Sequence, residues 1–356
     1  MKNQFLNVNK LKHKMEVYVM KRSNGADETS MKMGEHKIIE IICRNIEHMP
    51  NMAAPFGDDV SALYLSDNKV AVLKTDMLVG KTDVPRGMDL MQAARKAVVM
   101  NVSDFASKGI QPMAALVALG LPEGYSEKDI TEIAKGLNSG AREYGAFIVG
   151  GDTNESSDLV ISVMLYGIAD KSSLILRKGA KPGDILAVTG FFGKSAAGLR
   201  ILMDGLKAPK GADKLIDAVL NPKARLAEGK ALSNSDAVSA AIDSSDGLAW
   251  SLNELSRFND VGFLLDNIPT ADETREFAEF NKLDPVELTL YGGEEYELVV
   301  TVKPDKWDIA KEAVEAAGGQ LIKIGKVLSE KENSWSSDGK KKLIEPRGWE
   351  HFKTHL

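Results

Sequence analysis

Residues 241–255 read Ala-Ile-Asp-Ser-Ser-Asp-Gly-Leu-Ala-Trp-Ser-Leu-Asn-Glu-Leu, and this segment is a clear indication of the fold class. A short apolar run enters an acidic loop with a glycine, and Leu248, Leu252 and Leu255 then recur at helical spacing. Strand, acidic loop and helix in direct succession are typical of an α/β domain, in which ligands gather at the carboxyl edge of the sheet. Strands and helices alternate along the rest of the chain as well, so we predict two α/β domains with mixed sheets.

On both sides of residues 241–255, turn and capping residues separate apolar segments that have the length of strands or helices. Ser126 with Asp129 forms a capping-box pattern, and Gly145 is placed to end the helix that follows. Lys181-Pro182-Gly183-Asp184 predicts a turn before a strand. We predict strands at 70–73, 113–119, 146–149, 159–166, 185–188, 297–302 and 321–327, and helices at 88–108, 126–145, from about 195, at 225–232, from 248 and at 304–317.

The length of 356 residues exceeds what one hydrophobic core usually serves, so two folded domains are expected. We place them at 35–172 and 173–356. Residues 1–34 are rich in Lys and Met and lack an apolar run of signal-peptide length, which predicts a disordered N-terminal extension rather than a secretion signal.

Composition excludes several classes of protein. The formal net charge of -6 argues against nucleic acid as the main partner, because that partner favours a basic surface. No apolar stretch is long enough to span a membrane. The single cysteine, Cys43, excludes an internal disulfide and fits the reducing cytoplasm. Cys43 lies in the apolar run 38–46, so we expect it in the core.

Acidic residues beside glycine or hydroxyl residues recur near the ends of the predicted strands. Carboxylate, hydroxyl and carbonyl oxygens suit Mg²⁺, and neighbouring glycines let backbone N–H groups approach phosphate oxygens. One such loop is more often a turn or a helix N-cap, but a set of them favours a shared magnesium and phosphate site. The loops are Gly57-Asp58-Asp59, Lys74-Thr75-Asp76, Asn101-Val102-Ser103-Asp104, Gly150-Gly151-Asp152-Thr153, Asp243-Ser244-Ser245-Asp246-Gly247 and Gly292-Gly293-Glu294-Glu295.

Three familiar types of site do not fit the sequence. Gly193-Lys194-Ser195 resembles the end of a Walker A loop, but Val188 stands where that pattern requires glycine. Residues 243–247 begin like a calcium loop and lack its later acidic ligands. All five histidines lie near the two ends of the chain, which disfavours a Ser-His-Asp hydrolase.

As an ordered set, these loops resemble the thiamine-monophosphate kinase family, within the larger group that includes aminoimidazole ribonucleotide synthetase. The resemblance covers about residues 35–352. The matching segments are 57–59, 74–79, 101–106, 150–153, 177–184, 242–248 and 292–298, with an aromatic residue, Trp349, near the C-terminus.

The resemblance implies transfer of a phosphoryl group from ATP to thiamine monophosphate, with Mg²⁺ as cofactor and ATP as co-substrate. Asp104 and Asp246 are then expected to be the catalytic residues. The magnesium site is expected at Asp59, Lys74, Thr75, Asp76, Asp104, Asp152, Asp243 and Asp246. The expected nucleotide contacts are Gly151, Asp152, Arg177 and Ser245, and the expected thiamine contacts are Asp83, Glu294 and Trp349.

The expected thiamine contacts Asp83 and Trp349 have different support: Asp83 departs from the family pattern, whereas Trp349 has a suitable side chain. Asp83 stands where the bacterial members tend to have a histidine. The aromatic face of Trp349 suits a cationic thiazolium ring. The alternative for Trp349 is that it packs a C-terminal segment onto the body of the protein.

The resemblance also implies the two-domain architecture of this group and a homodimer whose N-terminal sheets join into a barrel. Direct in-line transfer is expected, since no Cys, Ser or His is placed as a covalent nucleophile. Selenophosphate synthetase and the hydrogenase-maturation protein are disfavoured because the cysteines they need are missing. Two alternatives stay open: an enzyme like aminoimidazole ribonucleotide synthetase, and a non-catalytic nucleotide-binding regulator on the same scaffold.

Overall fold

The computed structural model describes residues 33–337 and 339–352. Residue contacts divide the chain into two compact units, of which the larger is His48–Trp349. In the smaller unit the described residues are 33–47 and 350–352. The predicted extension lies outside the described residues, apart from Met33 and Gly34. Among the described residues, no helix is long and apolar enough to cross a membrane.

The smaller unit contains helix α3, Glu35–Asn45, which has Glu35 in its first turn and Arg44 in its last, as the helix dipole favours. None of its residues is buried. The prediction that Cys43 lies in a core is therefore wrong, because Cys43 is only half-buried. The described part of this unit is one helix and a short C-terminal segment, which offers too little apolar surface to cover the run 38–46.

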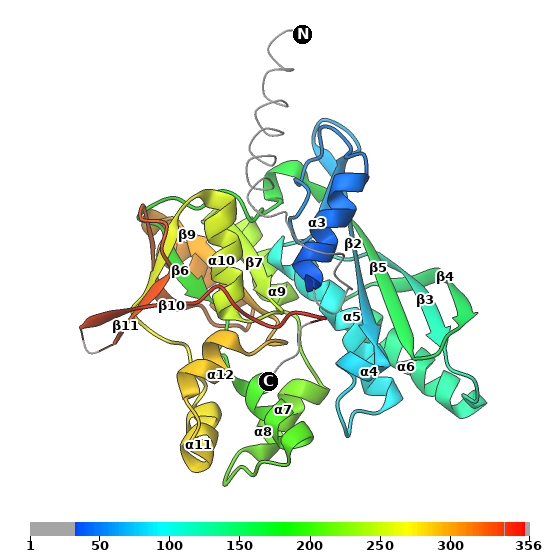
Figure 1. Cartoon of the computed structure of the whole chain (residues 1–356). Coiled ribbons are helices and arrows are strands. Elements are labelled where there is room, and N and C mark those ends of the chain that lie inside the picture. The colour runs from blue at the N-terminus through cyan, green and yellow to red at the C-terminus, as the bar shows by residue number, and fades with distance from the viewer. Residues whose placement is uncertain (1–32, 338, 353–356) are drawn as a thin grey trace. The chain divides into compact units, whose positions relative to one another are not determined.

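The first sheet of the larger unit has five strands in the order β1-β2-β5-β3-β4 (Figure 1). Neighbouring strands are antiparallel except β3 and β4, which are parallel. A parallel pair needs a crossover connection, and helix α6 provides it. The elements are β1 (Ser61–Tyr64), β2 (Lys69–Val79), β3 (Ala114–Leu121), α6 (Glu127–Glu143), β4 (Phe147–Glu155) and β5 (Val160–Asp170).

Helix α5, Leu90–Ser107, packs against strands of both sheets of the larger unit. It begins with a capping box between Asp89 and Gln92, and most of its residues from Ala93 onward are buried. It contacts β2, β5 and α6 of the first half, and also α9 (Leu226–Asn234) and β7 (Val238–Ser244) of the second. Side chains at the C-terminal end of α5 can therefore meet residues from both sheets.

The second sheet has seven strands in the order β12-β11-β8-β10-β6-β9-β7. All neighbouring pairs are antiparallel except β11 with β8. Its central strands are nearly continuous apolar runs, as expected for strands covered on both faces. The strands are β6 (Ile185–Val188), β7 (Val238–Ser244), β8 (Gly262–Leu265), β9 (Glu297–Val302), β10 (Ile322–Leu328), β11 (Ser334–Ser337) and β12 (Lys340–Leu343).

The remaining helices cover this sheet or form a separate small cluster. Helix α10 packs on β7 and β8, and α13 packs against α9. Helices α7, α8, α11 and α12 surround a small apolar core around Leu215 and Phe277. The helices are α4 (Gly80–Asp83), α7 (Lys194–Asp204), α8 (Ala212–Leu220), α9 (Leu226–Asn234), α10 (Leu248–Asn259), α11 (Asp272–Asn281), α12 (Pro285–Tyr291) and α13 (Trp307–Ala316), with 3₁₀ turns at Lys171–Ser173 and Pro304–Lys306.

The predicted fold class, α/β with mixed sheets, is confirmed. The predicted domain boundary at 172/173 falls between the last strand of the first sheet and the first strand of the second. Both sheets lie in the larger unit, so a domain boundary at this position stays a prediction. Two of the predicted loops are wrong: residues 74–76 continue β2, and residues 150–153 continue β4. Backbone pairing with β5 and β3 extends these strands through polar residues, which a search for apolar runs does not detect.

Candidate active site

Three acidic side chains from separate elements meet in the larger unit. Asp59 lies in the loop before β1, Asp104 is near the end of α5, and Asp243 is near the end of β7. One carboxylate oxygen from each of the three lies within 4.8 Å of the others. All three residues are buried. We call Asp59, Asp104 and Asp243 the acidic cluster.

Positively charged side chains contact two members of the acidic cluster. The Lys108 ammonium lies 2.7 Å from Oδ2 of Asp59. Arg177 Nε donates to Oδ1 of the same carboxylate at 2.6 Å. Lys74 Nζ lies 3.0 Å from Oδ2 of Asp104. Buried carboxylates are tolerated when cations or hydrogen bonds satisfy them, so these contacts neutralise part of the charge.

The three carboxyl groups have different proton affinities. Burial alone would raise the pKa of Asp59, but Arg177 and Lys108 outweigh that and hold this pKa well below its usual range. Burial raises the pKa of Asp104 well above its usual range, and Lys74 offsets this only in part. Burial and the neighbouring Asp59 raise the pKa of Asp243 to about 6. Two of the three carboxyls thus lack enough positive charge nearby.

The surroundings of the acidic cluster fit a hard divalent cation such as Mg²⁺. Ser103 Oγ donates to Asp243 Oδ2 at 2.7 Å, so the site combines hydroxyl and carboxylate oxygens. The amide oxygen of Asn101, one turn before Asp104 on α5, is buried and has no hydrogen-bond partner among the described residues. A cation would supply the positive charge that Asp104 and Asp243 lack, without requiring them to bind protons.

Lys74 was expected in the magnesium site, and its side chain contributes charge there. Burial would lower the pKa of this ammonium, but Asp104 and Asp76 raise it above its usual range. A protonated amine has no lone pair for a metal. The Lys74 side chain therefore cannot bind a metal directly while it is protonated, and the expectation that Lys74 belongs to the magnesium site stays a prediction.

Thr75 and Asp76 lie on β2, beside the strand residues of β5. Thr75 Oγ1 donates to the carbonyl of Val163 at 3.2 Å. The Asp76 carboxylate accepts from Met77 N at 2.8 Å, and its charge raises the pKa of Lys74. Their role as metal ligands stays a prediction.

Gly151 and Asp152 lie on β4, the edge strand of the first sheet, and both are exposed. A Cβ at Gly151 would lie 1.9 Å from the carbonyl of Val117, so close pairing with β3 accounts for this glycine. Asp152 is outside the group of carboxylates that converge within 4.8 Å among the described residues. The expected contacts of both residues with nucleotide or metal stay predictions.

Arg177 is part of the site through its contacts with the protein. Besides Asp59, its guanidinium donates to Glu254 at 3.2 Å and to the Gly57 carbonyl at 3.0 Å. These bonds already occupy several donors of the guanidinium group. The expected contact of Arg177 with nucleotide stays a prediction.

The loop with Ser245 and Asp246 is held by two neighbouring segments of chain. Glu294 N donates to the Ser245 carbonyl at 2.6 Å, and Trp349 N donates to the Asp246 carbonyl at 3.0 Å. A Cβ at Gly348 would lie 2.2 Å from that Asp246 carbonyl, so only glycine allows this approach. The structure therefore places the backbone of Glu294 and Trp349 beside the loop with Ser245 and Asp246, and the roles expected of these four residues stay predictions.

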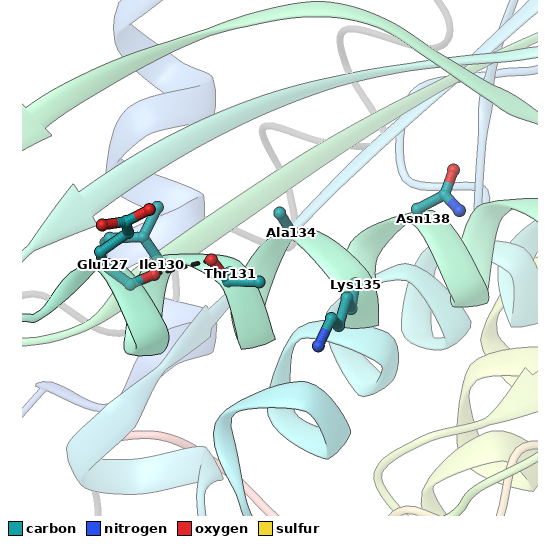
Figure 2. Close-up of a pocket in the computed structure, with 6 residues that line it drawn as sticks. All are labelled: Glu127, Ile130, Thr131, Ala134, Lys135 and Asn138. Carbon is teal, nitrogen blue, oxygen red and sulfur yellow. Dashed lines mark hydrogen bonds between the residues drawn. The ribbon is translucent and has the colours of Figure 1, made fainter.

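A shallow hollow along α6 does not belong to this site. Figure 2 shows six residues of this single helix lining it. None of them is a member of the acidic cluster or an expected site residue. They are Glu127, Ile130, Thr131, Ala134, Lys135 and Asn138.

Sequence reasoning missed the basic and hydroxyl residues that α5 brings to the site. Lys96 and Lys108 are both buried, and Ser107 Oγ donates to Asp59 Oδ2 at 2.7 Å. The available signal was their spacing: residues 96, 100, 103, 104, 107 and 108 recur at helical intervals within a largely apolar segment. Lysines at such positions indicate buried ion pairs.

Comparison with known proteins shows which family the chain is similar to. The family described as AIR synthase related protein, N-terminal domain, matches residues 57–169, and its C-terminal domain matches residues 181–336. A thiamine-monophosphate kinase from Pyrococcus horikoshii is 39% identical over 90% of this chain and 97% of its own length. One from Nitrosopumilus maritimus is 35% identical over 90% of this chain and 99% of its own length.

The fold is also similar to solved structures. The structure described as "AaThiL complexed with AMPPCP and TMP" superposes with a TM-score of 0.79 at 28% identity, over 92% of this chain and all of the other. The two family models together match both halves of the chain, and the two kinases align over 97% and 99% of their own lengths. The chain belongs to the thiamine-monophosphate kinase family.

Proposed function

We propose that this protein transfers a phosphoryl group from ATP to thiamine monophosphate, giving ADP and thiamine diphosphate. Family membership supports this reaction, as does the similar structure whose description names AMPPCP and TMP. The observation that carries the proposal is the convergence of Asp59, Asp104 and Asp243 from three separate elements. Because ATP is the co-substrate, we also propose a cytoplasmic location.

Charge is the main obstacle to this reaction, since two anionic substrates must approach each other. Asp59, Asp104 and Asp243 would hold Mg²⁺, with Thr75, Asp76, Asp152 and Asp246 as further proposed ligands. When bound, Mg²⁺ would offset the negative charge of the phosphates. Lys74 and Arg177 add fixed positive charge beside the same carboxylates.

The protein's own contribution is to orient the two substrates. The acceptor is a phosphate oxygen that is already anionic, so no general base is needed. We place the thiamine part near Glu294, Trp349 and Asp83, and the nucleotide near Gly151, Asp152, Arg177 and Ser245. Alignment of the acceptor oxygen with the terminal phosphate then accounts for direct transfer.

Product identity is the direct test. The full-length protein is incubated with ATP, Mg²⁺ and thiamine monophosphate, and the products are separated by liquid chromatography. Thiamine diphosphate and ADP should form in equal amounts and only when all three components are present. ADP without thiamine diphosphate, or turnover of formylglycinamidine ribonucleotide instead, would contradict the proposal.

We also propose that the protein is a homodimer that pairs through the five-stranded sheet. The face of this sheet opposite α5 leaves large apolar side chains exposed, among them Met77, Leu116, Phe147 and Ile168. Strand pairing places these four on one face. An exposed apolar face of this extent is typical of a protein–protein interface.

Light scattering coupled to size exclusion tests the dimer. The chain has a mass of 38.6 kDa, so the wild type should elute with about twice that mass. Leu116→Glu should give monomers, because a charge within a dry interface is costly. Ile130→Glu, at an exposed position on α6, is the matched control and should stay dimeric. A monomeric wild type would refute this part of the proposal.

A further inference from the structure

Lys96 is a buried lysine that the reaction described above does not use. It lies in the second turn of α5, and only 1% of its side chain is exposed. An ammonium group at such a position is stable only when hydrogen-bonding partners surround it. The structure provides two partners, the carbonyl of Asp83 at 2.9 Å and the carboxylate of Glu294.

The first partner fixes the short segment that follows β2. Asp83 is the last residue of α4, and its carboxylate accepts from Val79 N at 2.7 Å at the start of that helix. Its backbone carbonyl, which a longer helix would have used, accepts from Lys96. Lys96 thus holds the C-terminal end of α4 against α5.

The second partner lies in a loop with unusual backbone conformation. Glu294 and Tyr296 both have positive φ, 61° and 54°. For residues other than glycine this costs free energy, and the conformation persists only where the surroundings impose it. Two backbone hydrogen bonds hold this loop conformation, from Glu294 N to Ser245 O and from Tyr296 N to Ser244 O. The ion pair with Lys96 holds the side chain of Glu294.

Accessibility differs between the two members of the ion pair. The Glu294 side chain is 27% exposed, whereas that of Lys96 is 1% exposed. A small molecule can therefore reach the carboxylate but not the ammonium. Lys96 can set the orientation of Glu294 without touching a ligand that Glu294 binds.

We propose that Lys96 is a positioning residue for thiamine monophosphate: it orients Glu294 and the end of α4 toward this substrate. The inference rests on the proposed function. The effect of Lys96 should fall on thiamine monophosphate and not on ATP, because its two partners, Glu294 and Asp83, are both expected thiamine contacts. The acidic cluster and the nucleotide contacts do not include it.

Steady-state kinetics of Lys96→Met, Glu294→Gln and the double variant test the proposal. Lys96→Met should raise KM for thiamine monophosphate about tenfold, within the range of coupling between directly contacting residues, and change KM for ATP less than twofold. In the Glu294→Gln background, Lys96→Met should add less than twofold. Lys96→Arg should recover part of the loss, since it keeps the charge.

Lys69→Met is the matched control, because Lys69 is an exposed lysine paired with Asp170 at 2.8 Å. Its kinetics should equal those of the wild type. Equilibrium binding of thiamine monophosphate, measured by calorimetry without ATP, should show the same loss in Lys96→Met as KM does.

Several outcomes would overturn the proposal. KM values for both substrates that stay unchanged while the melting temperature falls would make Lys96 purely structural. An undiminished effect of Lys96→Met in the Glu294→Gln background would show that it does not act through Glu294. If Lys96→Met fails to fold, Lys96→Gln decides, because glutamine keeps a hydrogen-bond donor but removes the charge, and a wild-type KM for thiamine monophosphate in that variant would refute positioning.

Failure of this inference is distinguishable from failure of the proposed function. A wild-type protein that makes no thiamine diphosphate refutes the function. A wild type that makes it, together with a Lys96→Met variant of unchanged KM for thiamine monophosphate, refutes only the role of Lys96.

Discussion

Asp104 shows at the scale of one residue how burial and neighbouring charge change the proton affinity of a carboxyl group. Its carboxyl is buried between Lys74 and the other two acids, and its pKa is raised well above the usual range. A group in that state binds a proton or a metal cation more readily than an exposed aspartate does. Residue type alone, in a chain with many exposed aspartates, does not indicate this difference.

We expect Asp104→Asn to lower turnover by about 10²-fold or more, since it removes a charged ligand and keeps the side-chain shape. The melting temperature should change little, because the neutral amide resembles the protonated acid. Steady-state assays and thermal unfolding measure the two effects. Asp170→Asn, at an exposed position on β5, is the control and should behave as the wild type. Near-normal turnover of Asp104→Asn would remove this residue from the proposed metal site.

Trp349 is the second residue whose role the structure sharpens. The alternative that it packs a C-terminal segment onto the body predicts a buried side chain, but 42% of this residue is exposed. Its backbone N–H donates to the carbonyl of Asp246, so the backbone of Trp349 lies next to that loop. Exposure next to the site favours a contact with substrate.

Trp349→Ala should raise KM for thiamine monophosphate by about 2–30-fold, from the loss of a cation–π contact of about 0.5–2 kcal/mol. Trp349→Phe should keep most of the affinity, because it keeps an aromatic face. Phe280→Ala, an exposed aromatic on α11, controls for the loss of a large side chain. A loss of stability in Trp349→Ala with unchanged KM would restore the packing interpretation.

At the scale of elements, close helix packing explains glycines that local sequence cannot. Helices α5 and α6 pack against each other, and a Cβ at Gly136 would lie 2.1 Å from the Met91 carbonyl. Gly140 makes a similar approach to Arg95, at 3.1 Å from its carbonyl. Glycine is unfavourable inside a helix, so its presence here reflects the short distance between the helices.

Gly136→Ala should therefore destabilise the protein by about 1–3 kcal/mol through overpacking, although alanine is the better helix former by about 1 kcal/mol. Urea unfolding followed by circular dichroism measures the change. Asn138→Ala on the exposed side of the same helix is the control, and it should leave stability unchanged or slightly raised. A more stable Gly136→Ala protein would show that α5 and α6 can move apart at little cost.

At the scale of the whole larger unit, the acidic cluster joins segments that are distant in the sequence. Asp59 precedes the first sheet, Asp104 belongs to α5, and Asp243 belongs to the second sheet. A cation bound by all three would hold these segments together. Binding to the folded state alone raises the free energy of unfolding.

Mg²⁺ should accordingly raise the melting temperature of the wild type in the absence of nucleotide. At about 100 times the dissociation constant the gain is about 2.7 kcal/mol. The Asp104→Asn protein should show a much smaller shift, and sodium chloride of equal ionic strength controls for screening. Equal shifts in both proteins would place the stabilising cation elsewhere. Chelator should reverse the effect in the wild type.

Different parts of the fold were predictable to different degrees. The capping box of Ser126 and Asp129 and the strand at 297–302 were predicted correctly, because each depends on neighbours in the sequence. Strands β8, β11 and β12 and helices α8, α11 and α12 were missed, since they are short and gain their stability from packing. Among site residues, Asp59, Asp104 and Asp243 were predicted, whereas Lys96 and Lys108 were not.

The alternation of strands and helices and the order of the acidic segments can be predicted from the sequence alone, because these are local patterns of residue type. The sequence also carries the resemblance to thiamine-monophosphate kinase. Three features depend on tertiary contacts: which carboxylates converge, the continuation of a strand through residues 74–76, and the partial neutralisation of the acidic cluster by the buried Lys108. The physical reason is that burial and distance set the energy of a charge, and both depend on residues far away along the chain.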